Sequence, residues 1–453
     1  MNMLAAAHVA NPVAARSQMG FSLGWHIVLA CFGVGLPGLV LFAEWRGQRT
    51  GDVAYRLLAR RWAKVLGVLF AVGAVSGTIL SIELGVLWSG LMANYGQVIG
   101  LPFAIEGIAF FVEAIFLGIY LYGWDRLPPR AHLLSGIPIF VAGVASAFFV
   151  VCANSWMNTP TGFTVSHGRI THVSPWAAMF NPATGPETTH MILAALMVTG
   201  FGVASVYAVA MLRGRRDRYH RLGLLIPLTG AAIVTPIQIV VGDWAARVVA
   251  TDQPTKLAAM EGLSQTTKGA PESLFGYYSG GRLHGALRIP DGLSLLARLN
   301  PHATIQGLDA VPAADRPSLV TVVHLSFDSM VSIGFGLLAL GAWLAWTWWR
   351  RREMPRSRWF LRAVAVSGVA AVAAMELGWV TTEVGRQPWI VYHVLRVANA
   401  VNPEPGIQYG YYSVVAIYAV LTVATIAVLR RFTKARPVPE APQESDVEEY
   451  TVS

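Results

Sequence analysis

The sequence predicts an all-α membrane protein, a polytopic bundle of about nine transmembrane helices. Of its 453 residues, 54% are hydrophobic and only 13% are charged, whereas soluble domains usually carry about 25% charged residues. Nine stretches approach the ~20 apolar residues that a helix needs to cross a bilayer. Lys and Arg also concentrate in alternate loops, as in multi-pass membrane proteins. Together these observations exclude a soluble protein and explain the net charge of +9 without a nucleic-acid partner.

The predicted spans follow one another without a linker of low complexity between two hydrophobic blocks. They cover residues 21–43, 65–82, 102–122, 133–152, 189–212, 223–242, 322–349, 360–380 and 411–429. Residues 1–20 lack the basic start, short apolar run and small-residue cleavage site of a secretory signal, so the first span is expected in the mature protein. Cys31 and Cys152 fall within spans and are interpreted as small buried side chains.

The distribution of basic residues predicts the orientation of the bundle. Of the 34 Lys and Arg residues, 23 lie within 46–64, 123–132, 213–221, 350–362 and 430–436. The short loops on the other side contain only Arg16, Arg169, Arg386 and Arg396. Since short cytoplasmic loops are the more basic ones, we expect the N-terminus outside and the C-terminus in the cytoplasm.

The membrane domain is expected to cover residues 1–432, and two segments of the chain are expected to lie outside the bilayer: a loop within this domain and a tail after it. Residues 243–321 form a predicted external loop that is rich in Gly and Pro and much longer than a helix connection requires. Such a loop is usually functional or disordered. Residues 433–453 contain several Pro and acidic residues and are expected to be a disordered cytoplasmic tail.

Ionisable side chains within spans are costly and usually face a cavity, a partner or a cofactor. They are His26, Glu106, Glu113, His190, His324, Asp328 and Glu376, and Met330 adds a soft potential ligand. The predicted topology places most of them in the external leaflet. His, Met and Glu at one depth, without a Cys cluster, favour haem ligation over zinc or an iron–sulfur cluster. Each residue alone is more often a packed polar group or a proton relay, so the hypothesis depends on their convergence.

Two carboxyl groups on the third span have a further interpretation. Glu106 and Glu113 are seven residues apart, so they share one face of the helix and differ in depth by about 10 Å. This spacing suits a proton ladder. The alternative is a pair of carboxyls that are hydrogen-bonded to neighbouring helices and only brace the bundle.

At these residues the sequence resembles subunit I of the cytochrome bd-type quinol oxidases, from Arg16 to about Arg431. The motifs that carry the resemblance are ARSQMGFSLGWH ending at His26, LPFAIEG around Glu106, GWDR from Gly123, ANSWMNTP from Ala153, NPATGPETTH ending at His190, QPTKLAAMEG from Gln253 and GWVTTEVGRQPW from Gly378. Their order and spacing together are highly specific, although each alone could arise by chance.

The resemblance implies three haems. His190 and Met330 would be the axial ligands of a low-spin haem b. His26 would ligate haem d, with Glu106 on its other face, and Glu376 would ligate a high-spin haem b. The division of His26, Glu106 and Glu376 between the two high-spin haems stays open.

The resemblance also implies a quinol site and a proton route. Lys256 and Glu261 match the external quinol-binding loop, and Glu113 and Ser146 match polar residues of the proton route. Some positions depart from the family. Asp328 stands where many members have Arg two residues before the Met ligand. At the positions of Ser81 and Glu83 the family often has Glu and then Gln, so one buried acid is shifted by two residues in this chain. The quinol loop lacks a long C-terminal insertion found in some relatives.

The predicted function is a terminal oxidase subunit that oxidises membrane quinol at the external face and reduces oxygen to water. Protons released outside and consumed from inside would generate a proton-motive force without pumping. The implied partners are a second membrane subunit, with or without a very small accessory subunit, in a bacterial cytoplasmic membrane. Two alternatives remain: a family member that carries only haem b, and a proton-coupled transporter in which Glu106 and Glu113 relay protons.

Overall fold

The computed structural model describes residues 3–166 and 169–433, and in this part of the chain nine helices are long and apolar enough to cross a membrane. They are α1 (Met3–Thr50), α2 (Val53–Leu87), α3 (Ser89–Gly123), α4 (Pro129–Asn158), α6 (Thr184–Leu212), α7 (Arg218–Asp252), α10 (Val320–Arg351), α11 (Arg358–Gly385) and α13 (Ile407–Thr433). The predicted helix bundle and its nine spans are confirmed.

The helices extend beyond both ends of the stretches that hydropathy selects, except that α6 ends with its span at Leu212. Span 65–82, for example, lies inside α2, which begins at an N-cap where the Asp52 side chain accepts from the backbone N–H of Ala54. Asp217 caps α7 and Ser357 caps α11 in the same way. Hydropathy marks only the hydrocarbon depth, whereas capped polar turns extend α2, α7 and α11 into the interface.

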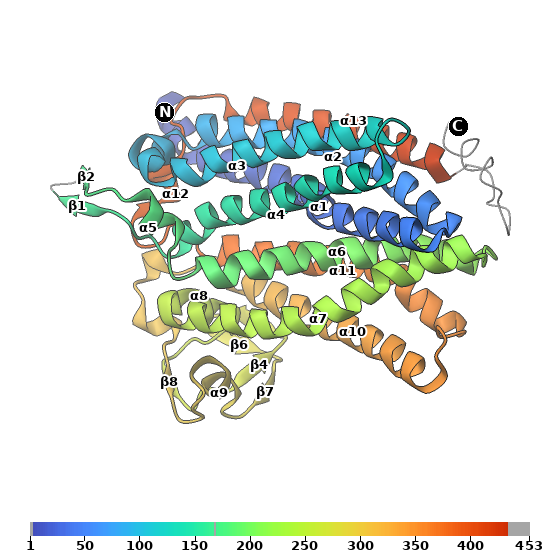
Figure 1. Ribbon diagram of the computed structural model, residues 1–453. Helices are drawn as coiled ribbons and strands as arrows, with labels where there is room; N and C mark the ends of the chain where they lie inside the picture. Colours follow the sequence, from blue (N-terminus) through green and yellow to red (C-terminus); the bar gives the residue numbers. More distant parts are fainter. Residues whose placement is uncertain (1–2, 167–168, 434–453) are drawn as a thin grey trace.

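The spans form two packed groups (Figure 1). Helix α1 packs against α2, α4, α6 and α13, and α3 packs against α4. Helices α6, α7, α10 and α11 form the second group, which meets the first through α1, α4 and α6. Close approach depends on small residues, since a Cβ at Gly200 of α6 would lie 2.8 Å from the carbonyl oxygen of Pro227 in α7.

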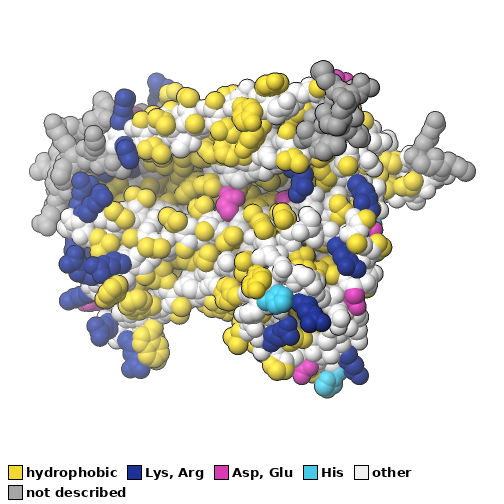
Figure 2. All heavy atoms as spheres, turned by 180° about the vertical axis from the view of Figure 1, so that it is seen from behind, with side chains coloured by type: hydrophobic (Ala, Val, Ile, Leu, Met, Phe, Trp, Pro, Cys, Tyr) yellow, Lys and Arg dark blue, Asp and Glu magenta, His cyan; other side chains and the backbone are white. Residues whose placement is uncertain are grey.

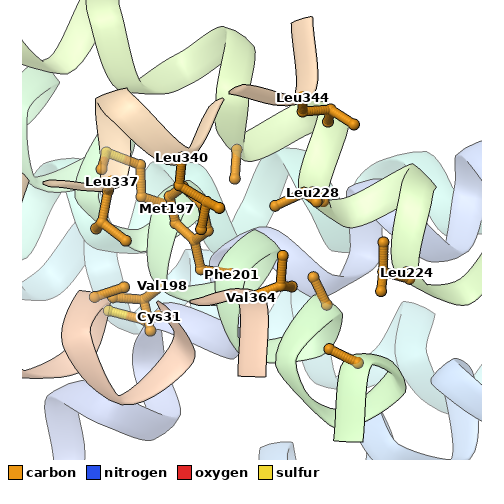
Figure 3. Close-up of a cluster of buried hydrophobic side chains, with 14 of the residues drawn as sticks. Cys31, Met197, Val198, Phe201, Leu224, Leu228, Leu337, Leu340, Leu344 and Val364 are labelled. Atoms are coloured by element: carbon orange, nitrogen blue, oxygen red, sulfur yellow. The ribbon is translucent and has the colours of Figure 1, made fainter. Parts of the chain in front are cut away.

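The largest apolar core lies where α1 meets the second group. Figure 3 shows Cys31 of α1, Phe201 of α6, Leu228 of α7, Leu340 of α10 and Val364 of α11 directed toward one another. Both Cys31 and Cys152 are fully buried free thiols, as the sequence predicts. This core fixes the positions of the helices that carry the candidate ligands.

Most of the region predicted as an external loop is folded. Residues 253–319, here called the lobe, contain α8 (Pro254–Met260), α9 (Gly292–Arg298), the one-turn helices η1 (Leu308–Ala310) and η2 (Ala313–Asp315), and short antiparallel strand pairs. The strands are β3 (Thr267–Lys268) with β8 (Thr304–Ile305), β4 (Glu272–Leu274) with β7 (Leu287–Ile289), and β5 (Tyr277–Ser279) with β6 (Arg282–His284). Residues 243–252 are the last turns of α7 instead, where an Asp243–Arg247 ion pair joins successive turns.

Smaller elements lie at the same end of the bundle as the lobe (Figure 1). They are the hairpin of β1 (Thr164–Ser166) and β2 (Arg169–Thr171), helix α5 (Pro175–Met179), the pair β9 (Trp389–Val391) and β10 (Leu395–Arg396), and α12 (Val397–Ala400). We call this end of the bundle the lobe end.

The opposite end of the bundle is rich in Lys and Arg (Figure 2). The turns after α1, α3, α6 and α10 and the end of α13 meet there, and these are the segments that the charge analysis assigns to the cytoplasm. We call it the basic end. Apart from Thr433, which ends α13, the predicted tail 433–453 lies outside the described residues.

Candidate functional site

His190 and Met330 lie in the second helix group, on α6 and α10. The imidazole of His190 faces α7, where the Gln238 amide nitrogen is 3.2 Å from Nε2. Its Nδ1 atom is buried and has no hydrogen-bond partner in the part of the chain that the structure describes. The Met330 sulfur faces α11, 3.0 Å from the point that a Cβ of Gly378 would occupy. An imidazole and a thioether are therefore held among α6, α7, α10 and α11.

His26 lies on α1 where this helix faces α2, and Glu376 lies on α11 where that helix faces α1. The Nδ1 atom of His26 is 2.8 Å from the hydroxyl of Ser76 on α2. Glu376 of α11 points toward α1, with Oε2 3.3 Å from the position of a Cβ on Gly24. Since Gly24 and His26 are two residues apart on one helix, the carboxylate and the imidazole lie within about one turn of each other in depth.

The carboxylates of α3 face α4 and α1. Glu106 accepts a 2.9 Å hydrogen bond from Ser146 of α4. Glu113 is 6% exposed, and its Oε1 atom lies 3.5 Å from a Cβ position at Gly143 of α4 and 3.9 Å from that at Gly33 of α1. Gly33 of α1 therefore lies at the depth of Glu113 of α3. His26 precedes Gly33 by seven residues, Glu106 precedes Glu113 by seven, and α1 and α3 run in the same direction. His26 and Glu106 thus share one depth, about 10 Å nearer the lobe end than Glu113.

A glycine from a neighbouring helix faces each of four candidate donors. A Cβ would lie 3.3 Å from Cε1 of His26 at Gly77, 3.3 Å from Cε1 of His190 at Gly242, 3.0 Å from Sδ of Met330 at Gly378 and 3.3 Å from Oε2 of Glu376 at Gly24. Because each of these positions is a glycine, no side chain of the neighbouring helix crowds the donor atom. The donor types and these glycines fit the binding of flat iron porphyrins.

Lys256 of α8 belongs to a buried polar network that joins the lobe to the membrane helices. The residue is 2% exposed, and its ammonium group donates to Asn158 Oδ1 at 3.0 Å. Asn158 also accepts from Arg386 at 3.2 Å and donates to Glu187 at 2.8 Å. Burial lowers the pKa of Lys256 to about 7, although the Glu187 carboxylate acts in the opposite direction. Lys256 is thus a buried amine, not a solvent-exposed charge.

Glu261 follows α8 and belongs to a different buried cluster. It is 4% exposed, and its Oε2 atom lacks a hydrogen-bond partner among the described residues. Burial and the neighbouring carboxylates of Glu272 and Asp328 raise the pKa of Glu261 well above its usual range. Burial and Asp328 likewise raise the pKa of Glu272 to about 7. The Glu272 carboxyl is therefore placed to hold and release a proton near neutral pH, while Glu261 favours its protonated form more strongly than a free carboxyl does.

Asp328, a buried acid of α10, is tied to the lobe. Its carboxylate accepts from the backbone N–H of Phe275 and lies 3.4 Å from Nε2 of His324. His324 is fully buried between two lobe carbonyls, those of Met260 at 2.7 Å and Phe275 at 2.9 Å. His324 and Asp328 thus hold the lobe against α10, the helix that carries Met330.

Several residues of these networks were not singled out from the sequence. Asn158, Glu187, Glu383 and Arg386 all fall in motifs that carry the family resemblance, so the motifs themselves were the signal. The buried Glu44–His132 pair, 2.7 Å apart, was missed because both residues lie just outside the apolar stretches. Glu83, a departure from the family pattern, is buried and accepts hydrogen bonds from Gln18 and Ser22.

The fold is that of a multi-pass membrane protein, and its buried His, Met and Glu side chains are of the types that ligate haem iron. The family model described as cytochrome bd terminal oxidase subunit I matches residues 14–437. The chain is 37% identical over 437 residues to the Bacillus subtilis protein named "Putative cytochrome bd menaquinol oxidase subunit I", covering 94% of this chain and 98% of that protein. It is 29% identical over 408 residues to cytochrome bd ubiquinol oxidase subunit 1 of Bacillus subtilis, covering 86% of each.

A solved structure gives the same result. The bd oxidase from Geobacillus thermodenitrificans matches with a TM-score of 0.87 and 37% sequence identity, covering 94% of this chain and 99% of that chain. The chain belongs to the cytochrome bd oxidase subunit I family. Membership implies an oxidoreductase with haem cofactors that oxidises quinol, reduces oxygen in respiration and works with a second subunit.

Proposed function

We propose that this chain carries two haems b and one haem d, oxidises quinol at the lobe end and reduces oxygen to water inside the bundle. His190 and Met330 hold the low-spin haem b, and His26, Glu106 and Glu376 serve the two high-spin haems. The observation that carries this proposal is that each of four candidate donors faces a glycine of another helix. Bound haem supplies one-electron transfer and oxygen binding.

The lobe supplies the quinol site. Lys256 lies within α8 and Glu261 directly follows it, but the two belong to separate networks, so they approach a quinol head from two directions. The Lys256 amine orients one oxygen of the head by hydrogen bonding. The ionised form of Glu261, whose Oε2 atom has no hydrogen-bond partner among the described residues, accepts a hydroxyl proton, which leaves at the lobe end. Glu113, about 10 Å nearer the basic end than Glu106, takes up protons from the other side.

This placement separates charge across the membrane without a pump. The basic end faces the cytoplasm by the positive-inside rule, and the lobe end faces outward. The chain acts in the bacterial cytoplasmic membrane with a second membrane subunit, with or without a very small accessory subunit. Exposed apolar side chains such as Ile82, Ile108 and Phe111 on α2 and α3 suit contact with lipid or a partner helix.

Haem analysis of the purified complex tests this proposal. We expect pyridine haemochrome spectra to show haem b and haem d in a 2:1 ratio. Haem b alone would identify a subclass without haem d and overturn that part of the proposal. A haem-free protein that carries solutes against a proton gradient would be a transporter instead. The described helices α2, α3 and α4 are continuous, whereas proton-coupled transporters often bind solutes at broken helices.

Substitutions in the lobe should separate quinol chemistry from haem binding. In Lys256→Met and Glu261→Gln variants we expect quinol-driven oxygen consumption to fall by at least about tenfold, while all haem spectra stay intact. The control is Lys268→Met, which removes an exposed lysine from the same lobe. Full activity in both lobe variants would contradict the proposed quinol site.

The same site should give a pH signature. Because burial lowers the pKa of Lys256 to about 7 from 10.5, its ammonium form is lost as the pH rises through about 7. We therefore expect the KM for quinol to rise above this pH in the native enzyme. A Lys256→Arg variant stays charged and should show a flatter profile over the same range. The profile is measured with dodecylmaltoside-solubilised complex, and an unchanged pH dependence in the Arg variant would argue against Lys256.

A further inference from the structure

The hydroxyl of Ser76 is the one described hydrogen-bond partner of the His26 ring. Ser76 lies on α2 and is fully buried. Its Oγ atom is 2.8 Å from Nδ1 of His26, and it also lies 3.0 Å from the carbonyl oxygen of Gly73 and 3.3 Å from that of Val72. The hydroxyl therefore connects the imidazole to the backbone of the preceding turn.

These contacts select one tautomer of His26. A serine hydroxyl has a single proton to donate. In a helix that proton is commonly donated to the carbonyl three or four residues earlier, which here is Gly73 or Val72. Oγ is then an acceptor toward Nδ1, so Nδ1 carries the ring proton. The lone pair is left on Nε2, the ring atom that does not face Ser76.

The residue after Ser76 provides space on the same edge of the ring. A Cβ at Gly77 would lie 3.3 Å from Cε1 of His26 and 3.9 Å from Nε2. The dipeptide Ser76–Gly77 thus places a hydroxyl at one ring nitrogen and no side chain beside the other. Tyr418 of α13 supports this turn, since its hydroxyl lies 3.5 Å from the carbonyl oxygen of Ser76 and its ring stacks on Trp25.

We propose that Ser76 is a positioning residue that fixes the tautomer and the orientation of His26, so that Nε2 is presented as an iron ligand. This inference rests on the proposed function, in which His26 binds haem iron. Outer-shell partners of ligating histidines commonly have this role, and their loss costs about 10–100-fold in metal affinity.

Three substitutions at Ser76 separate hydrogen bonding from packing. Ser76→Ala removes the hydroxyl, Ser76→Cys keeps the approximate size with a weak acceptor, and Ser76→Thr keeps the hydroxyl. The matched control is Ser81→Ala, because Ser81 also lies on α2 and donates to the carbonyl four residues earlier at 3.0 Å but is exposed. His26→Ala defines complete loss of the ligand.

The measurements are haem content, reduced-minus-oxidised spectra and the iron–histidine stretching band in resonance Raman spectra of the whole complex. We expect the Ala and Cys variants to bind the haem at His26 about 10–100-fold more weakly and to shift the iron–histidine band. The Thr and Ser81→Ala variants should match the native enzyme, and the His190–Met330 haem should stay unchanged throughout.

Two results would overturn the inference. Native haem content and an unmoved band in both the Ala and Cys variants would show that the hydroxyl has no role. Equal damage in the Thr and Ala variants would show that the position acts only through packing. Unchanged haem signals in His26→Ala would instead contradict the proposed ligand, which distinguishes failure of the proposed function from failure of this inference.

Discussion

Loss of either His190 or Met330 should remove the low-spin haem b signal from the enzyme. Met330→Leu keeps nearly the same side-chain volume and deletes only the sulfur donor. His190→Ala deletes the imidazole. We expect the reduced low-spin band to vanish or to become high-spin in both variants. Quinol-driven oxygen consumption should fall by more than the roughly 10–100-fold that loss of an outer-shell partner costs. Optical difference spectra and oxygen-electrode measurements of the complex test both expectations.

The matched control is Met197→Leu. Met197 is 7% exposed in the core of the second helix group, on the same helix as His190. The same substitution there changes packing without touching a proposed ligand, so the low-spin band should persist. An unchanged low-spin spectrum in both His190→Ala and Met330→Leu would show that the ligands lie elsewhere.

The architecture of the membrane domain could be predicted from the sequence, because bilayer thickness imposes a length and a composition on each span. The nine predicted stretches all lie within helices of the structure. Their ends could not be predicted equally well. Residues 243–252 continue α7 because charged residues at a helix end can pair with each other and face water, and hydropathy cannot distinguish them from a loop.

The structure of the lobe was much less accessible to sequence reasoning. Its strands have two or three residues each, too few for a period-two pattern to appear. Its turns depend on backbone conformations such as that of Gly276, which has φ +105° and would place a Cβ 2.6 Å from the carbonyl oxygen of His284. The need for glycine at position 276 becomes apparent only when the fold brings His284 of β6 next to it.

The candidate donors could be found in the sequence because ionisable residues are rare within apolar spans. Their partners could not. Ser76, Gln238 and the glycines that face the donors are ordinary residues of membrane helices, and only the packing of α2, α7 and α11 brings them to a ligand. The same reasoning applies to Asp328, whose charge the sequence left without a partner and the structure places beside His324.

The carboxylates of α3 show how packing also refines the proposed proton route. Ser146 donates to Glu106, and Gly143, one turn earlier on α4, lies against Glu113. The order from the basic end toward the lobe end is therefore Glu113, Ser146 and Glu106. Ser146 stands between the two carboxyls in depth, as a hydroxyl that can both accept and donate a proton.

Replacing Glu113 with Gln should interrupt this route while leaving the haem sites intact. Glutamine has the size of glutamate but cannot release a proton, so we expect full haem content and normal reduction by quinol, with oxygen consumption and membrane charging at least about 100-fold slower. The control is Glu83→Gln, the same change at a buried carboxyl on α2 near the lobe end. Turnover and charging are measured in proteoliposomes, after haem content has been verified. A fully loaded Glu113→Gln enzyme with native turnover and charging would exclude an obligatory relay at this residue, and lost haem would indicate a structural role instead.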